Sequence, residues 1–437
     1  MLQTQQTHQD DKSGGPRIGL ALAGGGPLGG IYEIGALLAL NEAIDGLDFH
    51  DVDIYVGVSA GSFVASTLAN GISVEEMGRL LVDREARQQR FDPALFMQPN
   101  FGEYLRRAAR VPRLFGQGLW RYLSNPFSHG LLESMSGLSR AIPTAIFDNR
   151  PIERFLADLF SNRGMTNDFR KLRHKLLIVA VDLDTGEAVK FGSAGYDDVP
   201  ISRAVQASTA LPGLYPPVKI RDRYFVDGGL KRTLHASTAL EDGVDLLFCV
   251  NPLVPYDASH AAPDGGKSRT SLAERGLPVV LSQTFRALIH SRMKVGMAKY
   301  DSSYVDRDVV LFEPDTGDSR MFFTNVFSYS NREMVCQHAY RTTRRDLWQR
   351  RSQLGPILAR HGVTINAKSL QDPDRHFSSA LSRRPDPKQL GHYKNRATNR
   401  LDGVLARLEA LVPGSRLSGN LKPQARRGGT RARSFRP

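Results

Sequence analysis

The feature that most constrains the fold is a repeated order of a short apolar run, a glycine turn and a helix-like segment. The first apolar run, residues 17–23 (RIGLALA), leads into glycines, and apolar residues at helical spacing follow from Ile31 to Ala39. A second run, residues 53–58 (DIYVGV), precedes small and apolar residues from Ala60 to Leu68. This order of strand, helix, strand and helix predicts a parallel sheet covered by helices.

Later parts of the chain extend the same pattern. Further strands are predicted at residues 175–181, 189–191, 224–226, 245–250 and 308–312, the last as an edge strand. The apolar content of 41% and the charged content of 24% are typical of a globular protein with a substantial core. We therefore expect an α/β fold, a three-layer α/β/α arrangement with inserted helices and a helical C-terminal region.

The composition along the chain predicts its division into segments. We expect a polar, disordered N-terminus (1–16), an α/β domain (17–255), a mixed and mainly helical extension (256–381) and a basic, largely disordered tail (382–437). Residues 77–160, rich in arginine and aromatic residues, are predicted to be a helical insert that could act as a lid. The aromatic residues of this insert either pack into the core or form a surface that docks onto lipid; they are Phe96, Phe101, Phe115, Trp120 and Tyr122.

The positive charge of the chain is concentrated in the tail. Residues 382–437 contain fourteen Lys and Arg against three acidic residues, so a net charge of +11 out of a total of +13 lies there. Such a tail attracts anionic lipid headgroups or nucleic acid, or simply keeps the protein in solution. We favour peripheral membrane contact, and do not expect nucleic acid to be the partner.

Other sequence features bear on cellular location. No run of 18 or more apolar residues is present, and the polar first sixteen residues do not resemble a secretory signal. The two cysteines, Cys249 and Cys336, lie far apart in apolar surroundings and suggest buried thiols in a reducing compartment. We expect a cytoplasmic protein, able to contact the inner face of the membrane.

A serine motif follows the second predicted strand. Gly57, Ser59 and Gly61 fit the pattern GxSxG, in which a serine stands at a sharp strand-to-helix turn and the glycines make room for its strained backbone. The pattern alone is weak, because a chain with this much glycine and serine has an appreciable chance of containing it. Its position between a strand and a helix is the context that the motif requires.

A glycine-rich turn follows the first predicted strand. It contains Gly24, Gly25, Gly26 and Gly29, and its backbone N–H groups at a helix N-terminus would form an anion site of the kind that acyl transfer needs. Gly25 and Gly26 are the expected donors, because Pro27 has no N–H. The turn also fits the dinucleotide pattern GxGxxG, but the next strand ends without the acidic residue that would hold a ribose.

An aspartate follows a later predicted strand. Asp227, Gly228 and Gly229 form a turn after residues 223–226. An aspartate in such a turn is most often a simple turn former. It could also direct its carboxylate toward Ser59 and, if partly desolvated, take the serine proton as a general base.

Together these three features resemble the patatin-like phospholipases. That family has a glycine-rich oxyanion loop, then GxSxG, then a DGG or DGA aspartate. Residues 181–187 (VDLDTGE), 206–213 (QASTALPG) and 215–218 (YPPV) are also similar to family segments, so the resemblance covers about residues 17–253. The ordered set is specific although its parts are not.

The resemblance implies a serine lipid acyl hydrolase, either a phospholipase A or a lipase or esterase. It makes Ser59 the nucleophile, Asp227 its base, and Gly24, Gly25, Gly26 and Gly29 the oxyanion loop, with no cofactor. The family usually reads GGGxRG, and this chain has Leu28 in place of the basic residue. That departure favours a neutral ester over a phosphate-bearing substrate.

Two other hypotheses stay open at this point. A Ser/His/Asp esterase would need a histidine after the acid, and His235 follows Asp227 by only eight residues. His174, His290 and His338 lie in helix-like or strand-like runs and are expected to be structural. The chain could also be a catalytically inactive scaffold that binds membranes or nucleic acid. No sequence pattern for a metal site is present, so we expect metal-independent chemistry.

Overall fold

The computed structural model describes residues 15–81, 98–124, 141–257, 259, 271–318, 321 and 329–382. The chain divides into two compact units, Met1–Ser382 and Arg383–Pro437, and all the described residues belong to the first. Residues 1–14 of the predicted N-terminal segment, Phe96 of the predicted insert and the tail beyond residue 382 lie outside the described residues.

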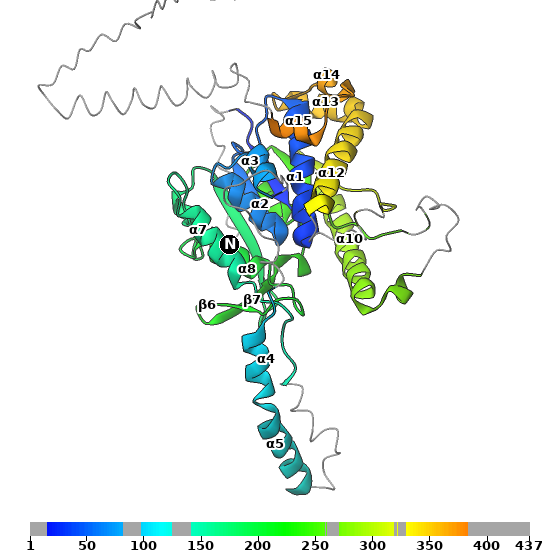
Figure 1. Ribbon diagram of the computed structural model, residues 1–437. Helices are drawn as coiled ribbons and strands as arrows, with labels where there is room; N and C mark the ends of the chain where they lie inside the picture. Colours follow the sequence, from blue (N-terminus) through cyan, green and yellow to red (C-terminus); the bar gives the residue numbers. More distant parts are fainter. Residues whose placement is uncertain are drawn as a thin grey trace, which may run out of the picture. The chain divides into compact units, whose positions relative to one another are not determined.

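A mostly parallel sheet forms the centre of the described unit (Figure 1). Its strand order is β6-β7-β4-β3-β1-β8-β9, with β5 paired to β4. The strands are β1 (Ile18–Leu22), β3 (Ile54–Val58), β4 (Lys175–Asp182), β5 (Ala188–Phe191), β6 (Val218–Ile220), β7 (Arg223–Asp227), β8 (Leu246–Val250) and β9 (Asp308–Phe312). The α/β fold class predicted from the strand and helix order is confirmed.

Because β1, β3 and β8 are parallel, their carboxyl ends lie on the same side of the sheet. Strand β1 is parallel to β3 and to β8, β3 is parallel to β4, and β8 is parallel to β9. By contrast, β4 is antiparallel to β5 and β7. Val58 lies opposite Val179, and the next residue of β4, Ala180, lies opposite Asp227. The end of β7 therefore comes to the same level of the sheet as the end of β3.

Side chains that alternate along the strands build a core on each face of the sheet. Leu20 and Leu22 belong to a large apolar cluster on one face, whereas Ala21 and Ala23 belong to a second cluster on the other. The first cluster includes residues of α1 (Gly26–Ala43), α2 (Ala60–Ala69), α8 (Ile201–Ser208) and α12 (Tyr329–Gln349). The second includes residues of α9 (Ala236–Glu241) and α10 (Leu277–Ser303). This arrangement is the expected three-layer one.

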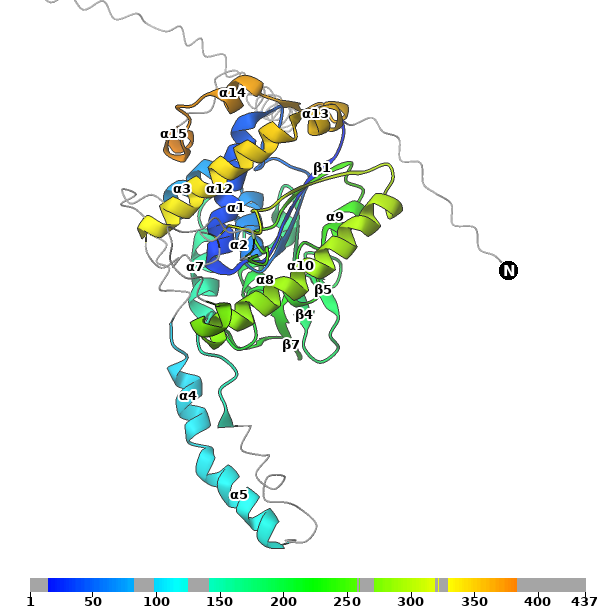
Figure 2. The ribbon, with the colours of Figure 1, turned by 90° about the vertical axis from the view of Figure 1, so that its right-hand side faces the viewer.

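Helices α1 and α12 lie side by side (Figures 1 and 2) although they are far apart in the sequence. A glycine allows this close approach, because a Cβ at Gly35 would lie 2.3 Å from the carbonyl oxygen of Cys336. Helix α1 is buried along most of its length. The apolar periodicity of α1 was enough to predict a helix. Its packing against α12 could not be predicted, because it depends on contacts between distant parts of the sequence.

Shorter elements complete the described unit. The remaining helices are α3 (Val74–Leu81), α4 (Phe101–Ala108), α5 (Val111–Ser124), α7 (Arg150–Phe160), α13 (Arg351–Arg360), α14 (Ala367–Gln371) and α15 (Phe377–Ser382). Short 3₁₀ turns occur at η3 (Phe169–Lys171), η4 (Gly228–Leu230) and η5 (Leu272–Arg275), and β2 (Ile44–Asp45) pairs antiparallel with β10 (Thr364–Ile365). Within the described ranges, no helix is both long and apolar enough to cross a bilayer.

Candidate functional site

Ser59 stands at a strained turn between β3 and α2. Its φ is 51° and its ψ is −124°, in the left-handed half of backbone space that side chains other than glycine rarely adopt. The flanking glycines have steric reasons to be there. A Cβ at Gly57 would lie 2.5 Å from the Cα of Ser62, and a Cβ at Gly61 would lie 2.5 Å from the carbonyl oxygen of Leu22. The sequence therefore folds this segment into the sharp turn expected of the motif.

The glycine-rich turn after β1 lies against this serine. A Cβ at Gly24 would lie 3.0 Å from the Cβ of Ser59 and 3.6 Å from its Oγ. Gly26 has a φ of +61°, and Gly25 and Gly29 touch, because a Cβ at Gly25 would lie 2.7 Å from the Cα of Gly29. Only glycine permits so tight a turn beside a neighbouring side chain.

The same turn presents unused hydrogen-bond donors at the start of α1. Among the described residues, the N–H groups of Gly24, Gly25 and Gly26 donate to no protein acceptor. The positive end of the helix dipole adds to their attraction for negative charge. An oxygen that gains negative charge next to Ser59 would be stabilised at this place. Leu28, where the resemblance would place a basic residue, belongs to the apolar core.

The carboxylate of Asp227 faces the hydroxyl of Ser59, and this proximity offsets part of the effect of burial on the pKa of the carboxyl. Its Oδ1 accepts a hydrogen bond from the N–H of Gly229 at 2.8 Å. The residue is only 4% exposed, and burial raises its pKa to about 6. Gly228 is required at the turn, because a Cβ there would lie 2.2 Å from the carbonyl oxygen of Val179. The structure thus brings Ser59, Asp227 and the glycine turn together.

A short segment at the end of α8 fixes the backbone of both polar residues. The Oγ of Ser208 accepts a hydrogen bond from the N–H of Ser59 at 2.9 Å and donates one to the carbonyl of Val179 at 2.6 Å. Two residues later, the carbonyl of Ala210 accepts a hydrogen bond from the N–H of Asp227 at 3.0 Å. No local motif predicts a role for Ser208. Its place in the QASTALPG stretch, which is similar to a family segment, is the sequence signal that points to it.

Among the described residues, neither Ser59 nor Asp227 has a histidine partner. The nearby His235 instead contacts the carbonyl oxygen of Gly228 through its Nε2 at 3.4 Å. Burial lowers its pKa to about 4, so it is uncharged at neutral pH. His174 and His338 contact Asp51 and Asp318, and His290 lies on α10.

The described part of the chain contains no group of three or more His, Cys, Asp or Glu side chains arranged to hold a metal ion. Both cysteines are buried as free thiols, as their apolar surroundings predicted. Burial raises the pKa of each thiol well above its usual range. The polar groups that converge near Ser59 are therefore a hydroxyl, a carboxylate and backbone N–H groups.

The sheet, the strained serine turn and the adjoining glycine turn define an α/β protein with a nucleophile-elbow type of site. A model of the patatin-like phospholipase family matches residues 20–240. This chain belongs to the patatin-like phospholipase family, as its motifs predicted. The matched range contains the serine, glycine and aspartate motifs.

Individual proteins show more distant similarity. The uncharacterized protein R571 of Acanthamoeba polyphaga mimivirus is 23% identical over 298 residues, covering 67% of this chain and 82% of that protein. Lysophospholipase NTE1 of Coccidioides immitis (strain RS) is 27% identical over 238 residues, which is 54% of this chain but only 12% of the lysophospholipase. The crystal structure of VipD from Legionella pneumophila matches with a TM-score of 0.33 and 16% identity, covering 77% of this chain and 67% of VipD.

Proposed function

We propose that this protein hydrolyses carboxylic esters of lipids, with Ser59 as nucleophile and Asp227 as general base. The approach of the Ser59 hydroxyl to the buried carboxylate of Asp227 carries the proposal. A carboxylate with a pKa of about 6 is a stronger base than an ordinary aspartate and is still ionised at neutral pH. The family to which the chain belongs supports a lipid ester as the substrate class.

The proposed reaction has two halves. Ser59 Oγ bonds to the ester carbonyl carbon while its proton passes to Asp227, and the carbonyl oxygen becomes an oxyanion held by the N–H groups of Gly25 and Gly26. Collapse of this intermediate breaks the ester C–O bond, and the leaving alcohol takes the proton from Asp227. Asp227 then removes a proton from water, which attacks the acyl-enzyme, and the released Ser59 recovers its proton.

The proposal includes a division of the chain and its contact with a membrane. We assign residues 17–255 as the catalytic domain and place the protein in the cytoplasm, at the inner face of the membrane. Helices α4 and α5 support such contact, because large apolar side chains on them are exposed to solvent: Phe101 (66%), Leu105 (72%), Phe115 (50%) and Trp120 (76%). Arg106, Arg110 and Arg113 lie between them, are exposed, and would attract anionic headgroups.

The nucleophile and the base can be tested separately. Ser59→Ala should abolish turnover of a short-chain p-nitrophenyl ester and labelling by a fluorophosphonate probe. Asp227→Asn preserves the shape of the turn but removes the base, so turnover should fall by about 10² to 10⁴-fold. Ser66→Ala is the matched control, because it removes another buried hydroxyl of α2, one that donates to the carbonyl of Phe63.

The same assay also tests the two alternatives, a Ser/His/Asp esterase and an inactive scaffold. His235→Ala should retain turnover within a few-fold of wild type, since no imidazole in the described part of the chain contacts Ser59. A His235→Ala protein as inactive as Ser59→Ala, beside an Asp227→Asn protein of near-normal rate, would support a Ser/His/Asp esterase instead. A wild-type protein with neither turnover nor probe labelling would support an inactive scaffold.

A further inference from the structure

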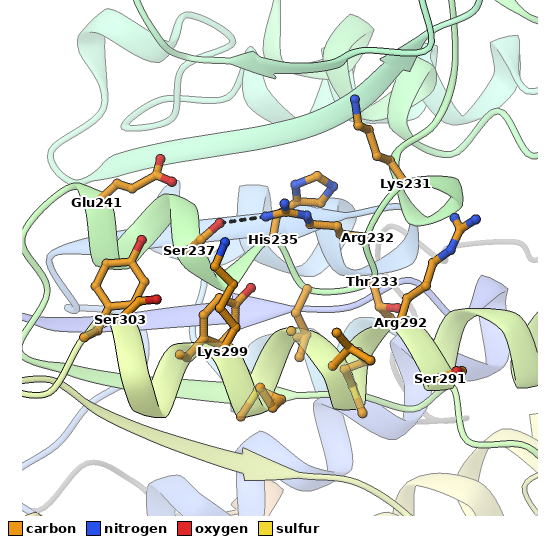
Figure 3. A pocket seen from close by; sticks show the side chains of 17 residues that line it. Lys231, Arg232, Thr233, His235, Ser237, Glu241, Ser291, Arg292, Lys299 and Ser303 are labelled. Carbon is orange, nitrogen blue, oxygen red and sulfur yellow. Dashed lines mark hydrogen bonds between the residues drawn. The ribbon is translucent and has the colours of Figure 1, made fainter.

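A cavity lies beside the turn that carries Asp227. Its volume is about 620 Å³, and it is bounded by α10 and by the loop that runs from η4 into α9. Figure 3 shows the side chains of Arg292 and Lys299 rising from α10 toward that loop. Two contacts join its wall to the turn: Arg292 donates to the carbonyl of Leu230 at 2.9 Å, and His235 contacts that of Gly228 at 3.4 Å.

The cavity carries a clear excess of positive charge. Lys231 and Arg232 contribute from the loop, and Arg292 and Lys299 from α10. Its single acidic lining residue, Glu241, is paired with Lys190 at 2.9 Å and so does not neutralise these groups. Lys231 pairs with Glu187. For the other three cations, the described residues provide no carboxylate partner.

The inner wall of the cavity has hydrogen-bonding groups and apolar surface. Arg232 donates to the hydroxyl of Ser237 at 3.3 Å, a contact drawn in Figure 3, and the described residues provide no acceptor for its other side-chain N–H groups. Thr233 lines the same wall, is only 3% exposed, and its hydroxyl has no hydrogen-bond partner among the described residues. Met293 and Met297 add apolar contact area on the α10 side.

We propose that this cavity binds a phosphate-bearing ligand. Around this cavity, three cations have no carboxylate partner among the described residues, which favours a group with several acceptor oxygens and more than one negative charge. The two guanidinium groups suit phosphate geometry. The cavity is large enough for more than an inorganic ion, and the methionines would contact the remainder of the ligand. The proposal does not depend on the roles given to Ser59 and Asp227.

The ligand could be soluble or the headgroup of a lipid, and two assays on the full-length protein distinguish these sources. Calorimetric titration with inorganic pyrophosphate tests a soluble phosphorylated compound. Flotation with phosphatidylcholine vesicles, with and without phosphatidic acid, tests a headgroup. Arg292→Gln and Lys299→Gln each remove one cavity charge. The matched control is Lys294→Gln, because Lys294 is an exposed residue of the same helix that does not line the cavity.

We expect wild type and Lys294→Gln to bind pyrophosphate or the phosphatidic acid vesicles equally well, and each cavity variant to bind roughly tenfold more weakly. The basic tail contributes equally to all four proteins, so the differences report on the cavity. Unchanged thermal unfolding temperatures would confirm that the variants fold. The proposal is overturned if wild type binds neither probe. It is also overturned if the cavity variants bind the probes with the same affinity as Lys294→Gln.

Discussion

The ionisation of a single carboxyl group, that of Asp227, should set the acid limit of activity. Burial raises its pKa from 3.8 to about 6, and only the ionised form can accept the proton of Ser59. We therefore expect kcat/KM for a soluble ester to fall as the pH decreases through about 6, by about tenfold for each further pH unit. Steady-state rates measured across the acidic range would show this limb.

The pH at which kcat/KM begins to fall distinguishes a buried base from an ordinary, exposed aspartate. An exposed aspartate would stay ionised, and the rate undiminished, down to about pH 4. Full activity at about pH 4.5, in a protein shown by circular dichroism to be folded, would contradict a buried base. The Asp227→Asn protein should lack the limb and show only its low residual rate.

At the residue scale, the sequence predicted those site residues whose motifs lie within a short stretch of the chain. Ser59 and the glycines could be recognised because a strand, a sharp turn and a helix follow one another within a few residues. Ser208 could not, since its hydrogen bond to the N–H of Ser59 joins residues 149 positions apart. The raised pKa of Asp227 was likewise only a possibility until its burial was known.

At the element scale, α1 contains a buried acid. Glu33 is fully buried, and burial raises its pKa well above 4.5. The folded protein therefore holds this carboxyl neutral at pH values where the unfolded chain ionises it. Unfolding then releases a proton, so the free energy of unfolding decreases by about 1.4 kcal/mol per pH unit as the pH rises between the two pKa values.

Relative to wild type, Glu33→Gln should accordingly flatten the pH dependence of stability above about pH 4.5, because Asp227 titrates in the same way in both proteins. It should also raise the free energy of unfolding near neutral pH, because the variant no longer holds an ionisable group neutral. Urea unfolding at a series of pH values measures both effects. Glu274→Gln, at an exposed position, is the control. Parallel pH dependences for Glu33→Gln and wild type would contradict the assignment.

Other elements show where sequence patterns stop being informative. The strands at 308–312 and 245–250 were predicted well, because short apolar runs bounded by polar residues are local signals. The 27-residue helix α10 was expected only as part of a mainly helical extension. Its apolar residues are spread around the helix with little amphipathic pattern, so its buried side, which includes Met293, follows from the sheet beneath it.

For the whole molecule, membrane adsorption should have an electrostatic and an apolar component. Truncation after Ser382 removes a net charge of +11, and each charge near an anionic surface contributes about 1 kcal/mol at most. The truncated protein should adsorb less to phosphatidylserine vesicles at low salt, and this difference should fade as salt is added. Equal adsorption at low salt would leave the tail without a part in binding.

Replacing Phe115 and Trp120 by serine should instead weaken adsorption at every salt concentration, since burial of apolar surface is not screened. Vesicle sedimentation of the double variant beside the truncated protein would separate the two components. Turnover of a soluble ester should be unchanged in both, because neither change removes Ser59, Asp227 or the glycine turn. Loss of that turnover would show damage to the fold rather than to membrane contact.

The strand order also has a consequence for biosynthesis. Strand β1 is made before both of its neighbours, β3 and β8, so one side of its backbone cannot pair with β8 until Val250 has left the ribosome. β9 and α12 follow later still, although β9 forms an edge of the sheet and α12 covers α1. Pairings so far apart in the sequence close slowly. Nascent chains of this protein must therefore spend much of their synthesis with an open apolar sheet edge, a state in which chaperones would protect them from aggregation.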